Sequence, residues 1–257
     1  FAYNKNKVLS LGDIDDQKGS RTITMVGRPY QAFYGYQSDG IFQSQEEIDN
    51  FTWRDPETGI KQKVQPNAKP GDFKYVDFNN DGKITDDDKQ YLGSYMPKIT
   101  FGFGGNLQWK GIDFSFQFQG VGKSTVYNGF KQMGYTGRGQ GGNMLADVKN
   151  SWEYNKTSGV PRIGLISDPN GNYNSLNDFF LEDASYLRLK NVTIGYTLPD
   201  NVMRAIGLPG STARFYLNGE NLFTATDYSG IDPEVGNFGI DGGTYPVARS
   251  FSIGFNF

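Results

Sequence analysis

The stretch that decides the fold is TFGFGGNLQWKGIDFSFQFQ, which runs from Thr100 to Gln119. Large apolar side chains occupy alternate positions in its two halves, namely Phe101, Phe103, Leu107 and Trp109, then Ile112, Phe114, Phe116 and Phe118. The positions between them in the second half are Asp113, Ser115, Gln117 and Gln119. A period of two is the side-chain period of a β-strand and excludes a helix. Lys110-Gly111 separates the halves as a two-residue turn, so the stretch predicts a β-hairpin with two distinct faces.

The same alternation recurs further along the chain. Residues 187–198, 214–223 and 247–257 form three more strand-like runs. In the first of these the apolar phase slips by one residue near Lys190 and Asn191, which predicts a β-bulge. Residues 1–9 and 22–42 also favour strands, with a break at Gly27-Arg28-Pro29. The sequence therefore predicts an all-β, antiparallel protein of about seven strands.

Composition excludes several function classes. The 257 residues carry 25 Lys and Arg against 28 Asp and Glu, a formal net charge of −3, which argues against a nucleic-acid binder. The absence of both Cys and His from the sequence excludes thiolate nucleophiles, imidazole bases and the metal sites they build. The carboxylates form no isolated pair on strands that face a common cleft, so we expect no enzyme.

Two architectures fit a strand with one apolar and one polar face, a soluble β-sandwich and a membrane β-barrel. The connections distinguish them. Short ones at Lys110-Gly111 and 199–210 alternate with long ones near 43–97, 123–184 and 224–246. Bacterial outer-membrane barrels combine short periplasmic turns with long external loops. We therefore expect a barrel wall with a polar lumen side. The chain opens on FAYNKNKVLSL, which suggests that it begins inside a longer protein.

One acidic segment fits a calcium-loop template. Its oxygen-bearing residues occupy the spacing of a twelve-residue loop around Gly82, as Asp77, Asn79, Asp81, Lys83 through its carbonyl, Thr85 and Asp88. A hard cation requires several oxygens within one tight turn, and glycine permits the bend at position six. The segment predicts a structural calcium site, and the alternative is an Asx-rich turn without metal.

Two other loop features have a structural and a functional interpretation. Residues 137–142 spell G-x-G-x-x-G, but no buried strand precedes them, so we expect a loop and no dinucleotide site. Aromatic residues in the long loops are candidates for stacking on a ligand, although such residues more often pack loops together. They are Trp53, Tyr127, Tyr135, Trp152 and Tyr154.

Several segments together resemble the C-terminal part of the SusC/RagA family of TonB-dependent outer-membrane transporters. The first group comprises Gly35-Tyr36 to Phe42, Gly71-Asp72 to Asp88 with Leu92-Gly93, and Met96-Pro97-Lys98. The second comprises Trp152 to Pro161-Arg162, LEDASYLRLKNVTIGYTLP, NGENLFTATDYSGIDPEVG and YPVARSFSIGFNF. They follow the family's order over nearly the whole chain, whereas the family's TonB box, plug domain and earlier strands do not occur in it.

The resemblance implies the last part of a large, plugged barrel of the 22-strand class in the outer membrane. Such a transporter imports glycans or peptides with a SusD-like surface lipoprotein and is energised through TonB. The terminal Phe251, Ile253, Phe255 and Phe257 are then expected to face lipid and to act as the signal for barrel assembly. The remaining alternative is a soluble, calcium-stabilised module that binds carbohydrate or protein.

Overall fold

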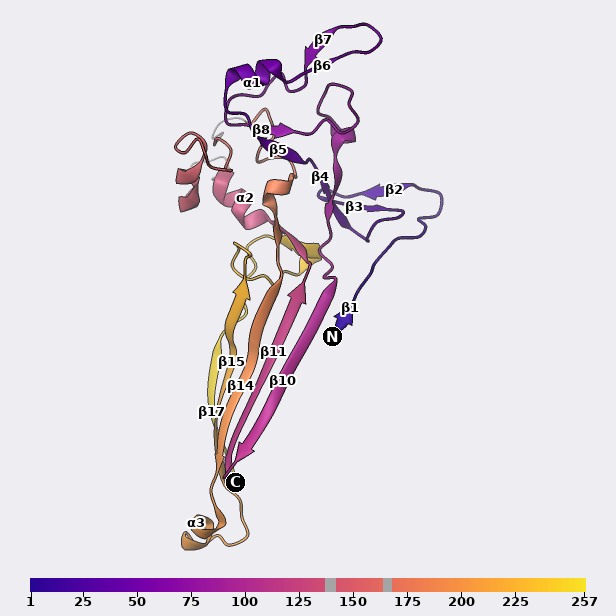
Figure 1. Ribbon diagram of the computed structural model, residues 1–257. Helices are drawn as coiled ribbons and strands as arrows, with labels where there is room; N and C mark the ends of the chain where they lie inside the picture. The colour runs from indigo at the N-terminus through magenta and orange to yellow at the C-terminus, as the bar shows by residue number, and fades with distance from the viewer. Residues whose placement is uncertain (137–141, 164–167) are drawn as a thin grey trace.

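The computed structural model describes residues 1–136, 142–163 and 168–257. Its largest sheet, called the wall sheet here, is antiparallel and has the strand order β1-β10-β11-β14-β15-β17. The strands are β1 (Ala2–Tyr3), β10 (Ile99–Trp109), β11 (Ile112–Gly122), β14 (Tyr186–Thr197), β15 (Arg214–Thr226) and β17 (Ser250–Asn256). The long strands, from β10 to β17 in this order, run side by side as one tall, open layer (Figure 1).

The hairpin predicted between β10 and β11 is confirmed. Trp109 pairs with Ile112, and the two residues between them turn the chain. Lys110 and Gly111 both have positive φ, 47° and 85°, as a turn of type I′ requires. This turn lies at the lower end of the wall sheet in Figure 1, together with α3 (Asp200–Ala205) between β14 and β15.

The predicted bulge in β14 is also confirmed. Gln117 of β11 pairs with Asn191, whereas the next residue, Phe118, pairs with Leu189, so Lys190 has no partner. The register of β14 with β15 shifts at the same place. Because one extra residue reverses the alternation, the apolar residues on both sides of Lys190 stay on one face of the sheet.

Most of the other described residues lie at the upper end of the wall sheet (Figure 1). We call the described residues within 4–98, 123–185 and 227–249 the external region. Its strands are β2 (Asp16–Lys18), β3 (Thr22–Met25), β4 (Ala32–Gly35), β5 (Ser38–Ile41), β6 (Thr52–Arg54), β7 (Lys61–Lys63), β8 (Phe73–Tyr75), β9 (Gln90–Gly93), β12 (Thr125–Asn128), β13 (Leu181–Asp183) and β16 (Ile240–Asp241). Its helical elements are α1 (Gln45–Asn50), α2 (Gly129–Thr136), η1 (Asp86–Asp88), η3 (Ala146–Asn150), η4 (Asp178–Phe180) and η5 (Asn237–Gly239). Among the described residues, no helix is long and apolar enough to cross a bilayer.

The first part of the chain differs from the sequence expectation. Within residues 1–9 only Ala2 and Tyr3 form a strand, which pairs with the upper end of β10. The strand-like run at 22–42 is broken where expected, since β3 ends at Met25 and β4 begins at Ala32. Its pieces are four residues long, much shorter than the roughly 9–11 residues of a membrane strand. They form small sheets in the external region, and residues 137–141, expected to be a loop, lie outside the described residues.

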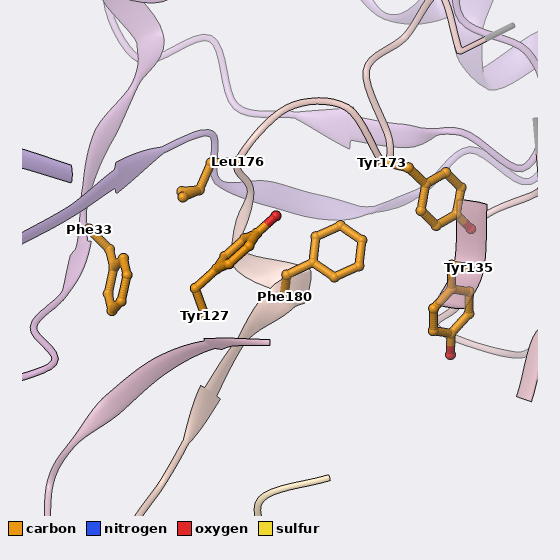
Figure 2. Close-up of a cluster of buried hydrophobic side chains, with 6 residues drawn as sticks. All are labelled: Phe33, Tyr127, Tyr135, Tyr173, Leu176 and Phe180. Atoms are coloured by element: carbon orange, nitrogen blue, oxygen red, sulfur yellow. The ribbon is translucent and has the colours of Figure 1, made fainter. Parts of the chain in front are cut away.

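The main buried cluster lies in the external region and not along the wall sheet. It consists of Phe33, Tyr127, Tyr135, Tyr173, Leu176 and Phe180, which come from β4, β12, α2 and the segment around η4 (Figure 2). The rings of Tyr135 and Tyr173 stack with centroids 5.9 Å apart. This cluster joins the first and second parts of the external region, so loops that are distant in sequence form one packed unit.

Candidate functional site

One face of the wall sheet is apolar and exposed. The strand register aligns its residues in rows across five strands: Trp109, Ile112, Tyr196, Phe215 and Phe255 in one row, then Leu107, Phe114, Ile194, Leu217 and Ile253 in the next. Ile253 is 83% exposed and Phe251, in a third row, 78%. Soluble monomers rarely expose a contiguous apolar patch larger than a few hundred Å². This face therefore has the character of a surface in contact with lipid.

The opposite face of the wall sheet is polar. Asp113, Ser115 and Gln117 lie on it, as the sequence predicted, together with Thr193 and Asn218. Thr193 and Asn191 both donate hydrogen bonds to Oδ1 of Asn218, over 2.8 and 2.9 Å. These short polar side chains bond across neighbouring strands and satisfy one another without a dry core, which suits a surface that faces water.

An ion pair crosses the polar face near its lower end. Arg214 of β15 binds both carboxylate oxygens of Asp113 on β11, although β14 lies between these strands. The residue beneath the pair is Gly195, and a Cβ there would lie 2.4 Å from Asp113 Oδ1. Glycine at this position therefore allows the two side chains to meet above the intervening strand.

A buried arginine links the wall sheet to the external region. Arg188 of β14 is 2% exposed, and its guanidinium pairs with Asp232 at 2.6 Å and Glu234 at 2.9 Å. It also donates to the hydroxyl of Thr224 on β15. The bulge residue Lys190 approaches the same Glu234 carboxylate at 3.5 Å. Two cations of one strand thus meet the acidic segment that connects β15 with β17.

A second buried charge holds two parts of the external region together. Asp72 is fully buried and forms an ion pair with Arg162 at 2.6 Å. Its carboxylate also accepts hydrogen bonds from the side chain of Asn172 and the backbone of Lys69. The hydroxyl of Tyr75 donates to the carbonyl of Gly171, and burial raises the pKa of this tyrosine. Sequence reasoning did not find the contacts with Arg162, Gly171 and Asn172, because these partners lie about a hundred residues from Asp72 and Tyr75.

The loop aromatics proposed to bind ligand are mostly engaged in packing. Tyr127 and Tyr135 are 0% and 1% exposed in the main cluster, so neither ring is accessible to a ligand in this structure. Trp53 covers Gly82, and Trp152 covers Gly71 while its indole N–H donates to Gln43. Of the five loop aromatics, Tyr154 is the one whose side chain is largely exposed to solvent, at 75%.

The acidic turn at 77–88 is closed by its own hydrogen bonds. Asp77 accepts from the backbones of Asp81 and Gly82, and Asp81 accepts from the backbone of Lys83. Asp88 is fully buried and accepts from Phe78 and Thr85. Within the described part of the chain, no three acidic side chains converge in a way that could hold a metal ion. The expected calcium ligands Asn79, Lys83 and Thr85 lie in the same turn, and the site stays a prediction.

The four residues proposed as an assembly signal lie at the end of the wall sheet. Phe251, Ile253 and Phe255 belong to β17, the last strand in the sheet order, and point to the apolar face. Phe257 follows directly and is 70% exposed, and its ring lies 6.3 Å from that of Phe255. Their arrangement agrees with a lipid-facing edge, while their role in assembly stays a prediction.

Known proteins that are similar in sequence to this chain share one description. No family model matches the chain. It is 37% identical over 275 residues to the TonB-dependent receptor P26 of Formosa agariphila, covering 100% of this chain and 26% of that protein. It is 29% identical to the TonB-dependent receptor SusC of Bacteroides thetaiotaomicron, covering 76% of this chain and 18% of that protein. The chain thus spans about a quarter, or less, of these relatives.

Solved structures agree with the sequence relatives. The RagAB peptide importer in its closed-closed state matches with a TM-score of 0.69 and 27% identity, over 98% of this chain and 26% of that one. Its open-open state matches with a TM-score of 0.68 and 25% identity. The match extends over the wall sheet and the external region together, because nearly the whole chain is covered. The chain belongs to the SusC/RagA family of TonB-dependent receptors, and its wall sheet is part of their outer-membrane β-barrel.

Proposed function

We propose that the protein containing this chain imports oligomeric nutrients, glycans or peptides, across the outer membrane. The observation that carries the proposal is that the whole of this chain matches part of a TonB-dependent receptor, and that its sheet has one apolar and one polar face. RagAB is described as a peptide importer and SusC as a TonB-dependent receptor. The substrate class is left as glycan or peptide, because these relatives differ and the chain covers only part of each.

Two partners follow from the same relationship. A SusD-like lipoprotein is expected to cover the external region, and TonB is expected to supply energy through a part of the protein outside this chain. The external region is suited to such contact because its loops are fastened by Asp72 and Arg188 into a packed surface. Catalysis is not expected, in line with relatives that are receptors and importers.

Uptake by cells tests this function. Cells that carry the full-length protein should accumulate fluorescent oligopeptides or oligosaccharides, and a protonophore that removes the energy source of TonB should abolish the accumulation. A deletion strain is the control, and affinity purification of the full-length protein should recover a lipoprotein. Equal accumulation in the deletion strain, across a panel of both ligand classes, would refute the import function.

The alternative function, a soluble binding module, would require the apolar face of the wall sheet to be covered. In a soluble protein the rows that contain Phe215, Leu217 and Phe251 would need a covering layer, yet these side chains are 50%, 56% and 78% exposed. Expression of residues 1–257 alone separates the two functions. A monomeric species that unfolds cooperatively without detergent would favour the soluble module.

Calcium at the acidic turn is a separate proposal and rests on the spacing of its oxygens. The turn presents side-chain oxygens of Asp77, Asn79 and Asp81 around the left-handed Gly82, whose φ is 81°. These oxygens also accept backbone N–H groups of the turn, and their remaining lone pairs would be the ones to bind calcium. The proposed role is structural, namely to fix the turn beneath Trp53.

A further inference from the structure

A cleft of about 730 Å³ lies where the wall sheet meets the external region. Its lining comes mainly from β9 and its connection to β10, from the residues after β11, and from η4 and β13. Five charged residues line it: Lys98, Lys123, Asp178, Glu182 and Asp183. The two lysines come from the connections that adjoin the β10–β11 pair, and the three acids come from one short segment.

The two lysines are neighbours across the sheet. Ile99 pairs with Gly122, and one step beyond this pair the backbone N–H of Lys98 donates to the carbonyl of Lys123. Both side chains are exposed, and in the described part of the chain neither ammonium group has a carboxylate within ion-pair distance.

The acids of the cleft are already engaged elsewhere. Asp178 accepts hydrogen bonds from the backbone and hydroxyl of Ser38, and Asp183 accepts from Ser185. Glu182 forms an ion pair with Lys131 at 3.1 Å and accepts from Ser229. Neutral donors thus satisfy Asp178 and Asp183, and Lys131 pairs with Glu182, whereas Lys98 and Lys123 have no anionic partner within the described chain.

The backbone around the lysines is held in place. The carbonyl of Lys98 accepts from Asn4 at 2.9 Å, and the N–H of Lys123 donates to the hydroxyl of Ser185 at 2.9 Å. Lys123 also has a φ of 57°, which is uncommon for a residue other than glycine. Unfavourable conformations that the surrounding structure maintains concentrate at ligand sites.

We propose that Lys98 and Lys123 form a binding site for an oxyanion, that is, a phosphate, sulfate or carboxylate group, at the upper rim of the wall sheet. Two ammonium groups that line one cleft can donate to different oxygens of one such group. The oxyanion has two potential sources, an acidic solute that enters the cleft and the head group of an anionic lipid at the rim. The site does not depend on the import function.

The test measures lysine acylation in the full-length protein, residue by residue, by peptide mass spectrometry. In a non-ionic detergent, inorganic phosphate at ten times its dissociation constant should slow the acylation of Lys98 and Lys123 about tenfold, because only the free fraction reacts. Lys61 on β7, also exposed and without a carboxylate within ion-pair distance in the described part of the chain, is the internal control and should keep its rate. Sodium chloride of equal ionic strength should protect neither lysine.

Variants and membranes complete the test. Lys123→Asn, which tolerates a positive φ, should remove the protection of Lys98, whereas Lys123→Arg should preserve it. Protection in nanodiscs of phosphatidylglycerol but not by free phosphate would support the site and assign it to lipid. The proposal is overturned if neither phosphate nor phosphatidylglycerol protects the two lysines more than Lys61, or if Lys98 stays protected in Lys123→Asn.

Discussion

The two faces of β11 predict that the same charged substitution has very different effects on stability at neighbouring positions. Gln117 is the middle residue of this eleven-residue strand, and Phe116 lies one residue away on the apolar face. One residue of a strand spans about 3.4 Å, so both side chains lie close to the middle of the membrane. We compare Phe116→Arg with Gln117→Arg, which place the same charge at nearly the same depth on opposite faces.

The expected cost of Phe116→Arg has two parts. An arginine that faces lipid at the midplane costs about 2–4 kcal/mol in barrel stability. The phenyl ring also lies 5.9 and 6.0 Å from those of Phe114 and Phe118 and covers Gly105. Aromatic pairs contribute about 0.5–1.5 kcal/mol each, so the total loss is about 3–7 kcal/mol. Gln117→Arg points to the polar face opposite Gly104 and should cost less than about 0.5 kcal/mol.

Unfolding of the full-length protein in phospholipid vesicles by guanidinium chloride measures both free energies. Phe116→Leu is the matched control, because it removes the ring contacts and keeps an apolar side chain, and should show only the smaller part of the loss. The assignment of faces is refuted if Gln117→Arg destabilises the protein as much as Phe116→Arg does.

Three further predictions concern the other parts of the chain. Arg188→Met leaves Asp232, whose side chain is 10% exposed, without its cation. Removal of one partner from a buried ion pair costs about 3–5 kcal/mol of stability. Hydrogen exchange of residues 227–249 should therefore accelerate, while that of β10 and β11 should not change. Unchanged exchange at 227–249 would show that Arg188 does not fasten this connection. Terbium bound in the acidic turn should luminesce on excitation of Trp53, which covers Gly82, and Asp81→Asn should weaken the binding; a protein that gives no signal and binds no calcium by calorimetry would contain a metal-free turn. Deletion of residues 252–257 should abolish insertion of the full-length protein and Phe257→Ala should reduce it, as scored by heat-modifiable migration on gels, and normal insertion of both variants would remove the assembly role.

Features set by neighbouring residues were predictable from the sequence. The alternation in β10 and β11, the Lys110-Gly111 turn and the bulge at Lys190 all depend on residues within a few positions of one another. A period of two assigns each side chain to a face before any partner is known. The lengths of the connections, short at one end of the sheet and long at the other, then indicated which kind of sheet this is.

Features set by the path of the loops required the tertiary structure. Tyr127 and Tyr135 appear in the sequence as loop aromatics, and the way β12 and α2 turn inward determines that they are buried. Asp72 meets Asn172 across a hundred positions, and no local pattern marks either residue as a partner of the other. The lysines of the proposed anion site, Lys98 and Lys123, are unremarkable in the sequence as well. Periodicity describes how consecutive side chains leave the backbone, whereas the long loops meet through packing and buried charge, and only the folded chain contains those contacts.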